Sequence, residues 1–168
     1  MQGNFFLIDS DALITAHRRY YSFDICPGFW NNLLRCHKEE RIFSINHVRQ
    51  ELLQGNDTDE LLQWVNNELP RSFFLEENST EVILAYKRIV NWAQDHPTYS
   101  DQAQVIFASS TDAWLVAFAH VHDAIIVTNE KPAPLSKNIV KIPDACEQFN
   151  VRHMDTFSML RSLRVAFN

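Results

Sequence analysis

The feature that most constrains the fold is an apolar run near the amino terminus that ends in two acids. Residues 4–8 have the length of a strand, and Asp9, Ser10 and Asp11 follow directly, before a helical pattern begins. A continuous apolar run is typical of a parallel strand buried on both faces, and ligands in open α/β sheets bind just beyond the carboxyl ends of such strands. Asp9 is therefore placed to hold a metal ion. The alternative is that Ser10 or Asp11 only N-caps the next helix.

Further strand-length runs alternate with helical patterns along the chain. We expect strands at residues 41–45, 72–75, 124–128 and 139–142. Helical patterns occupy residues 11–17, 27–37, 46–54, 57–69 (starting at Asp57 or Thr58), 79–95, 100–108, 112–120, 144–149 and 155–163. Such alternation favours a parallel sheet with helices on both faces. The sequence predicts one α/β domain over residues 1–168, with about four or five short strands.

Composition excludes several classes of site. Only 3 glycines are present, too few for a Gly-rich phosphate loop. The 3 cysteines are widely spaced, with no C-x-x-C pair, which argues against structural zinc. No signal peptide and no run near the roughly 18 apolar residues of a membrane span are present, so we expect a soluble cytoplasmic protein without membrane contact. A net charge of -6 argues against self-sufficient nucleic-acid binding, and it suits a carboxylate site with divalent cations or a basic partner chain.

Four acids lie where predicted elements meet. Asp9 ends the first strand, Glu51 lies near the start of a helix, Asp112 begins an almost wholly apolar helix, and Glu130 follows the strand at 124–128. Magnesium and manganese take oxygen ligands, usually a few carboxylates completed by water. Two such ions can activate water and stabilise the leaving oxygen of a phosphodiester. Carboxylates that converge from separate elements are what this chemistry needs.

Each of these acids also has a structural interpretation. Asp112 follows Ser109 at the spacing of a capping box and could serve only the helix terminus. Glu51 and Glu130 could be solvated surface acids. Asp11, Asp144 and Asp155 are better explained as helix caps than as metal ligands.

A basic and aromatic segment follows the first predicted helix. Arg18, Arg19 and Tyr20 could bind phosphate and stack on bases, and an ordinary surface turn explains them about as well. We therefore treat these three residues as candidates for nucleic-acid binding.

Four segments together resemble the PIN-domain nucleases. They are IDSDALI at 8–14, VRQEL at 48–52, TDAWLVA at 111–117 and IVTNE at 126–130, and their order spans most of the chain. Residues 18–30 and 141–146 are similar to a PIN-like branch of poorly characterised prokaryotic proteins.

The resemblance implies a three-layer α/β/α fold and a metal-dependent endoribonuclease, often the toxin of a toxin–antitoxin pair. It implies Mg²⁺ or Mn²⁺ as cofactor, RNA as substrate and an antitoxin protein as partner, and it leaves a homodimer open. By motif match, Asp9, Glu51 and Asp112 take the places of three metal-binding carboxylates. The fourth family acid is commonly an aspartate, and Glu130 is its nearest equivalent here.

Two other functions stay open at this point. A haloacid-dehalogenase-like phosphatase also has an apolar strand followed by Asp-x-Asp, so Asp9 would be its nucleophile and Asp11 its general acid. That family needs a further acidic pair well downstream, and little chain remains after Lys131. The third function is a catalytically inactive PIN-like module that binds another protein, which the acidic charge favours.

Overall fold

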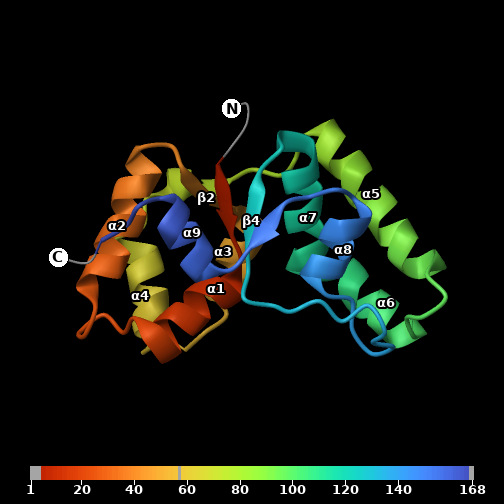
Figure 1. The fold of residues 1–168 in the computed structure, drawn as a ribbon, viewed down its shortest axis with the longest axis horizontal. Coiled ribbons are helices and arrows are strands. Elements are labelled where there is room, and N and C mark those ends of the chain that lie inside the picture. Colours follow the sequence, from red (N-terminus) through yellow and green to blue (C-terminus); the bar gives the residue numbers. More distant parts are fainter. Residues whose placement is uncertain (1–4, 57, 167–168) are drawn as a thin grey trace.

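The computed structural model describes residues 5–56 and 58–166. In this part of the chain, five parallel strands form a sheet of order β3-β2-β1-β4-β5, which runs through the middle of the molecule (Figure 1). The strands are β1 Phe6–Ile8, β2 Ile42–Ile45, β3 Phe74–Leu75, β4 Ile125–Val127 and β5 His153–Met154. The predicted α/β class with about four or five parallel strands is confirmed.

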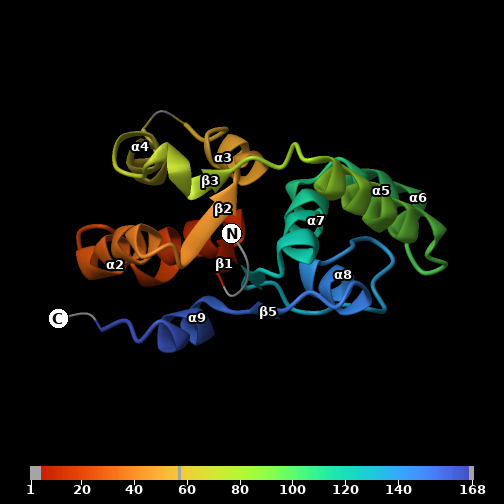
Figure 2. The same ribbon diagram turned by 90° about the horizontal axis from the view of Figure 1, so that it is seen from above.

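Helices cover the sheet on both sides, which completes the three layers. Figures 1 and 2 show α2, α4 and α9 on one side and α5, α6, α7 and α8 on the other. The helices are α1 Ser10–Thr15, α2 Pro27–Lys38, α3 Asn46–Leu52, α4 Glu60–Asn67, α5 Thr80–Asp95, α6 Asp101–Ala108, α7 Thr111–His122, α8 Ile142–Gln148 and α9 Thr156–Ser162. A π-helix, η1 Ala16–Tyr20, continues α1, and a 3₁₀ turn, η2 Arg71–Phe73, leads into β3.

The central position of β1 explains its continuous apolar sequence. Strand β1 pairs with β2 on one side and with β4 on the other, so both of its edges are hydrogen-bonded. Both faces are covered as well, and Leu7 and Ile8 are almost fully buried. In the register with β4, Ile8 lies opposite Val127. The next residues, Asp9 and Thr128, therefore leave the sheet side by side.

Helix α7 is buried, as its apolar sequence predicts. It packs against α5, α3 and α6, and five consecutive residues from Leu115 to Ala119 are buried. A helix that is apolar on most of its circumference is buried in a core. Its first turn carries Asp112, so packing of the rest of the helix fixes the position of this acid.

The predicted strand at residues 139–142 is wrong. Residues 139–141 have no regular structure, and Ile142 is the first residue of α8. Pro143 lies in the first turn of α8, where proline is well tolerated because its missing N–H would have no helical partner there. Ile142 and Val140 are buried nonetheless, so the apolar pattern correctly indicated burial and not strand.

The last strand is β5, which the sequence did not predict. It has two residues, His153 and Met154, paired with Ile126 and Val127 of β4. Two positions named in the expected elements, Asn4 and Asp57, lie outside the described residues. Among the helices of residues 5–56 and 58–166, none is both long and apolar enough to cross a membrane.

Candidate functional site

Asp9 is a buried acid at the junction of β1 and α1. It occupies the N-cap position of α1 without a side-chain cap bond, and its backbone N–H donates to the Val127 carbonyl at 3.0 Å. Its Oδ2 accepts a hydrogen bond of 2.9 Å from the Thr128 hydroxyl, and its Oδ1 a longer one of 3.4 Å from Ser10. With 3 % of its surface exposed, this carboxyl group is held between the ends of two central strands.

The surroundings of Asp9 oppose its ionisation. Burial raises the pKa of Asp9 from its usual 3.8 to about 8, and the negative charge of Asp112 contributes to the increase. The hydrogen bond from Thr128 acts in the opposite direction and lowers the pKa. Desolvation and like charges are the two conditions that keep a carboxyl group protonated near neutral pH. The ionisation of Asp9 is thus opposed by burial and by other acids, Asp112 first among them.

Asp112 is the second member of this acidic group. Its pKa is raised to about 7, mainly by burial and also by the charges of Glu130 and Glu51, while the charge of Lys141 acts to lower it. The capping-box interpretation does not apply, because Ser110 is the N-cap of α7 and the Ser109 hydroxyl donates back to the Val105 and Ile106 carbonyls. The first turn of α7 therefore carries a carboxyl group whose pKa is raised by burial and by the charges of Glu130 and Glu51.

Glu130 is engaged with the segment that precedes α8. Its Oε1 lies 2.5 Å from the Lys141 Nζ, and its Oε2 accepts from the Ile142 backbone N–H at 2.9 Å. Its own N–H donates to the Thr128 hydroxyl at 3.2 Å. Thr128 therefore connects Asp9 to the backbone of Glu130, and Lys141 neutralises the Glu130 carboxylate.

Glu51 is the most exposed of the four predicted acids. It lies in the last turn of α3 with an exposed side chain, and its charge raises the pKa of Asp112. The four acids are thus related electrostatically, since the charges of Asp112 and Glu130 raise the pKa of Asp9. The charges of Glu130 and Glu51 in turn raise the pKa of Asp112. Whether they act as catalytic or metal-binding residues stays a prediction.

The acidic group has the type of side chain that binds a divalent cation, but its side chains are not yet close enough together to bind one. Carboxylates from several elements are the donors that hard divalent cations prefer, and a cation would relieve the repulsion that raises the pKa of Asp9 and Asp112. In the described part of the chain, however, no three His, Cys, Asp or Glu side chains are grouped closely enough to hold a metal. The residue types therefore fit a metal site, while the Glu130 carboxylate is held by Lys141.

The candidate nucleic-acid-binding residues Arg18, Arg19 and Tyr20 are all exposed in η1. Arg18 lies 3.6 Å from the Asp59 carboxylate, and Tyr20 packs edge-on against Phe157 at 5.5 Å. This segment continues α1, the helix that follows Asp9. Their binding role is not tested by these contacts and stays a prediction.

The other acids have structural partners. The Asp155 side chain accepts from the Ser158 N–H and caps α9, as predicted. Asp144 is buried and accepts from the Ala133 N–H, which ties the proline-containing loop to α8. Asp11 is not the N-cap of α1. It accepts instead from the Thr15 hydroxyl one turn later, a contact within its own helix that does not favour a role as general acid.

Sequence reasoning missed two residues of this site, Thr128 and Lys141. Thr128 was visible as the polar end of the apolar run at 124–128, and the strand register places it beside Asp9. No local signal marks Lys141, which was expected to lie in the strand at 139–142. The ion pair depends on the irregular backbone of residues 139–141.

Comparisons with known structures identify the fold. The VapBC2 structure from Rickettsia felis bound to a DNA fragment of its promoter contains a chain of 13 % identity, with a TM-score of 0.56, covering 90 % of this chain and 98 % of that one. A chain of the FitAB structure bound to the IR36 DNA fragment is 14 % identical, with a TM-score of 0.55, and the match covers 90 % of this chain and 94 % of that one. A chain of the FitAcB structure from Neisseria gonorrhoeae is also 14 % identical, with a TM-score of 0.55, and the match covers 89 % of this chain and 96 % of that one. The resemblance to PIN domains is thus confirmed at the level of the fold.

Sequence comparison places the chain in a family. No curated protein matches it. A family model described as "Domain of unknown function (DUF4411)" matches residues 6–167. This chain, with its PIN-like fold, therefore belongs to the family of the domain of unknown function DUF4411.

Proposed function

We propose that this protein is a Mg²⁺- or Mn²⁺-dependent endoribonuclease and the toxin component of a toxin–antitoxin pair. The observation that carries the proposal is the effect of Asp112 on Asp9, two carboxyl groups from different elements: the charge of Asp112 raises the pKa of Asp9, and both pKa values are raised. Strongly perturbed acids of this kind are typical of functional sites. The PIN-like fold shared with chains of the VapBC2 and FitAB structures supports the same assignment.

Asp9, Asp112 and Glu51 would hold the cation, and Glu130 would join them after separating from Lys141. When bound, the divalent ion lowers the pKa of a water molecule and stabilises the charge that develops on a phosphodiester. Thr128 fixes Oδ2 of Asp9, so the more weakly bonded Oδ1 is the oxygen with capacity for another partner. Lys141, once released, would supply a positive charge beside the RNA phosphate.

Arg18, Arg19 and Tyr20 would contact the RNA outside the acidic group. The Arg18–Asp59 pair is largely exposed on the arginine side, and such pairs contribute little to stability. Arg18 can therefore exchange Asp59 for a phosphate at little cost. Tyr20 has 54 % of its surface exposed and offers a ring on which a base can stack.

A basic antitoxin protein is the partner that the charge of the chain favours. The net charge is -6, and the VapBC2 and FitAB structures were both solved with DNA fragments. An acidic chain contacts DNA more readily through a basic partner than by itself. A homodimer, and a single domain over residues 1–168, are also part of this proposal.

Cleavage of single-stranded RNA tests the proposal. We expect the wild-type protein to cleave RNA with Mn²⁺ and to lose this activity with a chelator. Asp9→Asn and Asp112→Asn should each lower the rate at least about 100-fold, because each removes a charged ligand of the proposed cation. Asp95→Asn is the matched control, since Asp95 is an exposed acid at the end of α5 and its variant should cleave like the wild type.

Three outcomes would contradict the nuclease assignment in different ways. Equal RNA cleavage by the wild type and both active-site variants would assign the activity to a contaminant. Hydrolysis of a phosphomonoester, lost in Asp11→Asn, would favour the phosphatase. Tight binding of a partner protein without cleavage by the purified, metal-loaded chain would favour the inactive binding module.

A further inference from the structure

Two exposed aromatic side chains, from η1 and α9, lie against each other on the surface. In the part of the chain that the structure describes, every other Phe, Tyr and Trp side chain is buried or partly buried. Tyr20 has 54 % and Phe157 41 % of its surface exposed, and their ring centroids are 5.5 Å apart with the planes at 70°. Single apolar residues on a surface are ordinary, but exposed rings that gather at one place indicate an interaction site. We call this pair the Tyr20–Phe157 platform.

Hydrogen bonds connect the platform to the acidic group. The Thr128 hydroxyl holds Asp9, and Asn129 is the residue that follows Thr128. The Asn129 Oδ1 accepts from the Thr156 N–H at 3.3 Å and from the Thr156 hydroxyl at 3.1 Å. Phe157 is the next residue, in the first turn of α9. The loop that orients Asp9 therefore also fixes the start of the helix that carries Phe157.

Tyr20 reaches the platform from the other direction. Helix α1 begins directly after Asp9, and η1 continues it to Tyr20; at about 1.5 Å per residue, residues 10–20 span roughly 15 Å. The Tyr21 N–H donates to the Ala16 carbonyl five residues earlier at 2.6 Å. This is the bond of a π-helix, a rare conformation that is frequent at functional sites. A single strand bound at the acidic group would need to extend only a few nucleotides to reach the two rings.

Cations without an ion pair border the platform. Arg161 is exposed and lies one turn after Phe157 on α9, so the two side chains are neighbours on the helix surface. The pKa of Asp155, the N-cap of α9, is lowered first by the hydrogen bond from the Ser158 N–H. The charges of Lys131 and Arg161 lower it as well, so both cations lie near Asp155. Within residues 5–56 and 58–166, neither cation makes an ion pair or a side-chain hydrogen bond.

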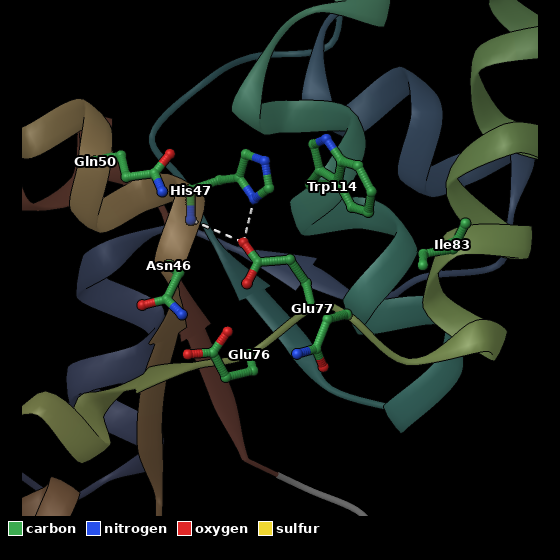
Figure 3. A pocket seen from close by; sticks show the side chains of 8 residues that line it. Asn46, His47, Gln50, Glu76, Glu77, Ile83 and Trp114 are labelled. Carbon is green, nitrogen blue, oxygen red and sulfur yellow. Dashed lines mark hydrogen bonds and ion pairs between the residues drawn. The ribbon is translucent and has the colours of Figure 1, made fainter.

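The aromatic cluster around Trp114 offers no such surface. His47 stacks on the Trp114 indole with centroids 4.9 Å apart, and Tyr86 with centroids 3.9 Å apart, so both faces of the indole are covered. Figure 3 shows Trp114 beside His47, whose Nδ1 and backbone N–H contact the Glu77 carboxylate. An incoming base would have to displace one of these packed rings, whereas the platform is already open.

We propose that the Tyr20–Phe157 platform binds one unpaired base of the single-stranded RNA substrate and that Arg161 and Lys131 contact the adjoining phosphates. The inference rests on the proposed function for its RNA, and it adds three binding residues outside the cleavage site. Aromatic rings hold unpaired bases by stacking, and every base has a face that can stack. Arginine and lysine contact phosphate without reading sequence. The platform therefore positions the RNA and does not select its sequence.

The charges beside the platform argue against a protein occupant. A basic antitoxin would be repelled by Arg161 and Lys131, whereas a phosphate backbone pairs with both. The nearby acid Asp155 is engaged as the cap of α9. A second copy of this chain carries the same net charge of -6, which opposes self-association.

Binding of single-stranded RNA in chelator tests the platform without cleavage. We would follow the fluorescence anisotropy of two labelled strands of about 12 nucleotides, a length within the site sizes of single-strand binders. One is an oligouridylate, and the other is an abasic strand with the same phosphates. We expect Phe157→Ala to weaken binding of the oligouridylate at least about fivefold and to leave the abasic strand unchanged. Phe157→Tyr, which keeps a ring at this position, should bind both strands like the wild type.

Arg161→Gln should weaken both strands, because it removes a phosphate contact. The slope of log affinity against log salt concentration should fall in magnitude by about 0.7, the contribution of one phosphate of a single strand. Phe157→Ala should leave this slope unchanged. Arg71→Gln is the matched control, since Arg71 is exposed in η2 beside the opposite edge strand β3, and it should bind both strands like the wild type. Melting temperatures check that every variant is folded.

The outcomes separate this inference from the proposed function. Base-dependent binding that needs Phe157, in a protein that does not cleave RNA, would support the platform and contradict the nuclease. RNA binding that none of these variants alters, or no RNA binding at all, would overturn the platform, and the cleavage assay alone then decides about the nuclease. Sedimentation equilibrium tests the remaining occupant. A dimer that dissociates in Phe157→Ala, with RNA binding unchanged, would also overturn the platform and assign the two rings to a second copy of the chain.

Discussion

The Thr128 hydroxyl donates a hydrogen bond of 2.9 Å to Oδ2 of Asp9, a residue 119 positions earlier in the chain. The parallel register of β1 and β4 makes this contact, since Ile8 and Val127 are paired and the next residues are neighbours. The same hydroxyl accepts from the Glu130 N–H. The Thr128 side chain thereby orients the Asp9 carboxyl group and also holds the start of the loop that carries Glu130.

We expect Thr128→Val, a change of similar shape, to raise the pKa of Asp9 above its value of about 8. The hydroxyl is the group that lowers this pKa, and its loss leaves the carboxylate less stabilised. The free energy of unfolding should fall by about 1–3 kcal/mol, because Oδ2 of Asp9 and the Glu130 N–H both lose a partner. Carboxyl ¹³C NMR and urea denaturation measure the two effects.

Thr80→Val is the control for this change, since Thr80 is exposed at the start of α5. It should change neither the pKa of Asp9 nor the free energy of unfolding. An unchanged titration of Asp9 in Thr128→Val would show that the hydrogen bond contributes nothing to the charge balance of the site.

Asp112→Asn should stabilise the metal-free protein at alkaline pH. The pKa of Asp112 is raised from 3.8 to about 7, so between these values the folded state binds a proton that the unfolded state has lost. The stability contributed by this group is therefore present at low pH and is lost as pH rises through about 7. We expect the variant to melt roughly 2–8 °C higher than the wild type at pH 9 in chelator.

The difference in melting temperature between Asp112→Asn and the wild type should become smaller below pH 5, because the wild-type carboxyl group is then protonated in the folded state. Thermal melts at several pH values measure it, with Asp95→Asn as control. A difference that stays constant from pH 5 to pH 9 would contradict the raised pKa.

Lys141→Met should increase the affinity for Mn²⁺ and weaken the metal-free fold. Lys141 and the proposed cation compete for the Glu130 carboxylate. Separation of a partly exposed ion pair such as Lys141–Glu130 costs up to about 1 kcal/mol. We therefore expect the dissociation constant of Mn²⁺ to be about two- to fivefold lower in Lys141→Met than in the wild type. Isothermal titration calorimetry measures the constant, and Lys137→Met, which changes an exposed lysine, serves as control. Weaker Mn²⁺ binding in Lys141→Met would exclude Glu130 as a competing ligand.

Manganese should raise the melting temperature of the wild-type protein. A ligand at 100 times its dissociation constant adds about 2.7 kcal/mol to the free energy of unfolding, which corresponds to roughly 5–11 °C for a chain of this size. Asp9→Asn should abolish most of this shift, because it removes the central carboxylate. A shift of equal size in Asp9→Asn would place the bound manganese elsewhere on the protein.

The sequence predicted the sheet and the buried helix because their signals are local. A central parallel strand and a core helix are apolar throughout, as in β1 and α7, and their polar ends are visible as Asp9 and Asp112. The strand β5 has no such signal, because it has two residues and His153 is exposed. Its pairing depends on the edge that β4 offers, which is a property of the assembled sheet.

The interactions of the candidate site were less predictable than its residues. Asp9 and Asp112 could be named from their positions, but the ion pair of Glu130 with Lys141 depends on the path of residues 139–141 between the loop and α8. The contact of Glu77 with His47 likewise joins the segment after β3 to the start of α3. Such contacts are set by tertiary packing, and no periodicity in the sequence carries them.

The strand order has a consequence for when the acidic group can form during synthesis. Strands β2 and β3 join β1 on one side, whereas β4 and β5 join it on the other. A nascent chain that has not yet produced β4 lacks the hydroxyl that holds Asp9 and the loop that carries Glu130. The long segment between β1 and β4 has to close into a loop before these contacts form, and only the contacts offset the entropy that loop closure costs. A nascent chain would therefore display the first acid without these partners until the segment from β4 to Glu130 has been synthesised and has paired with β1.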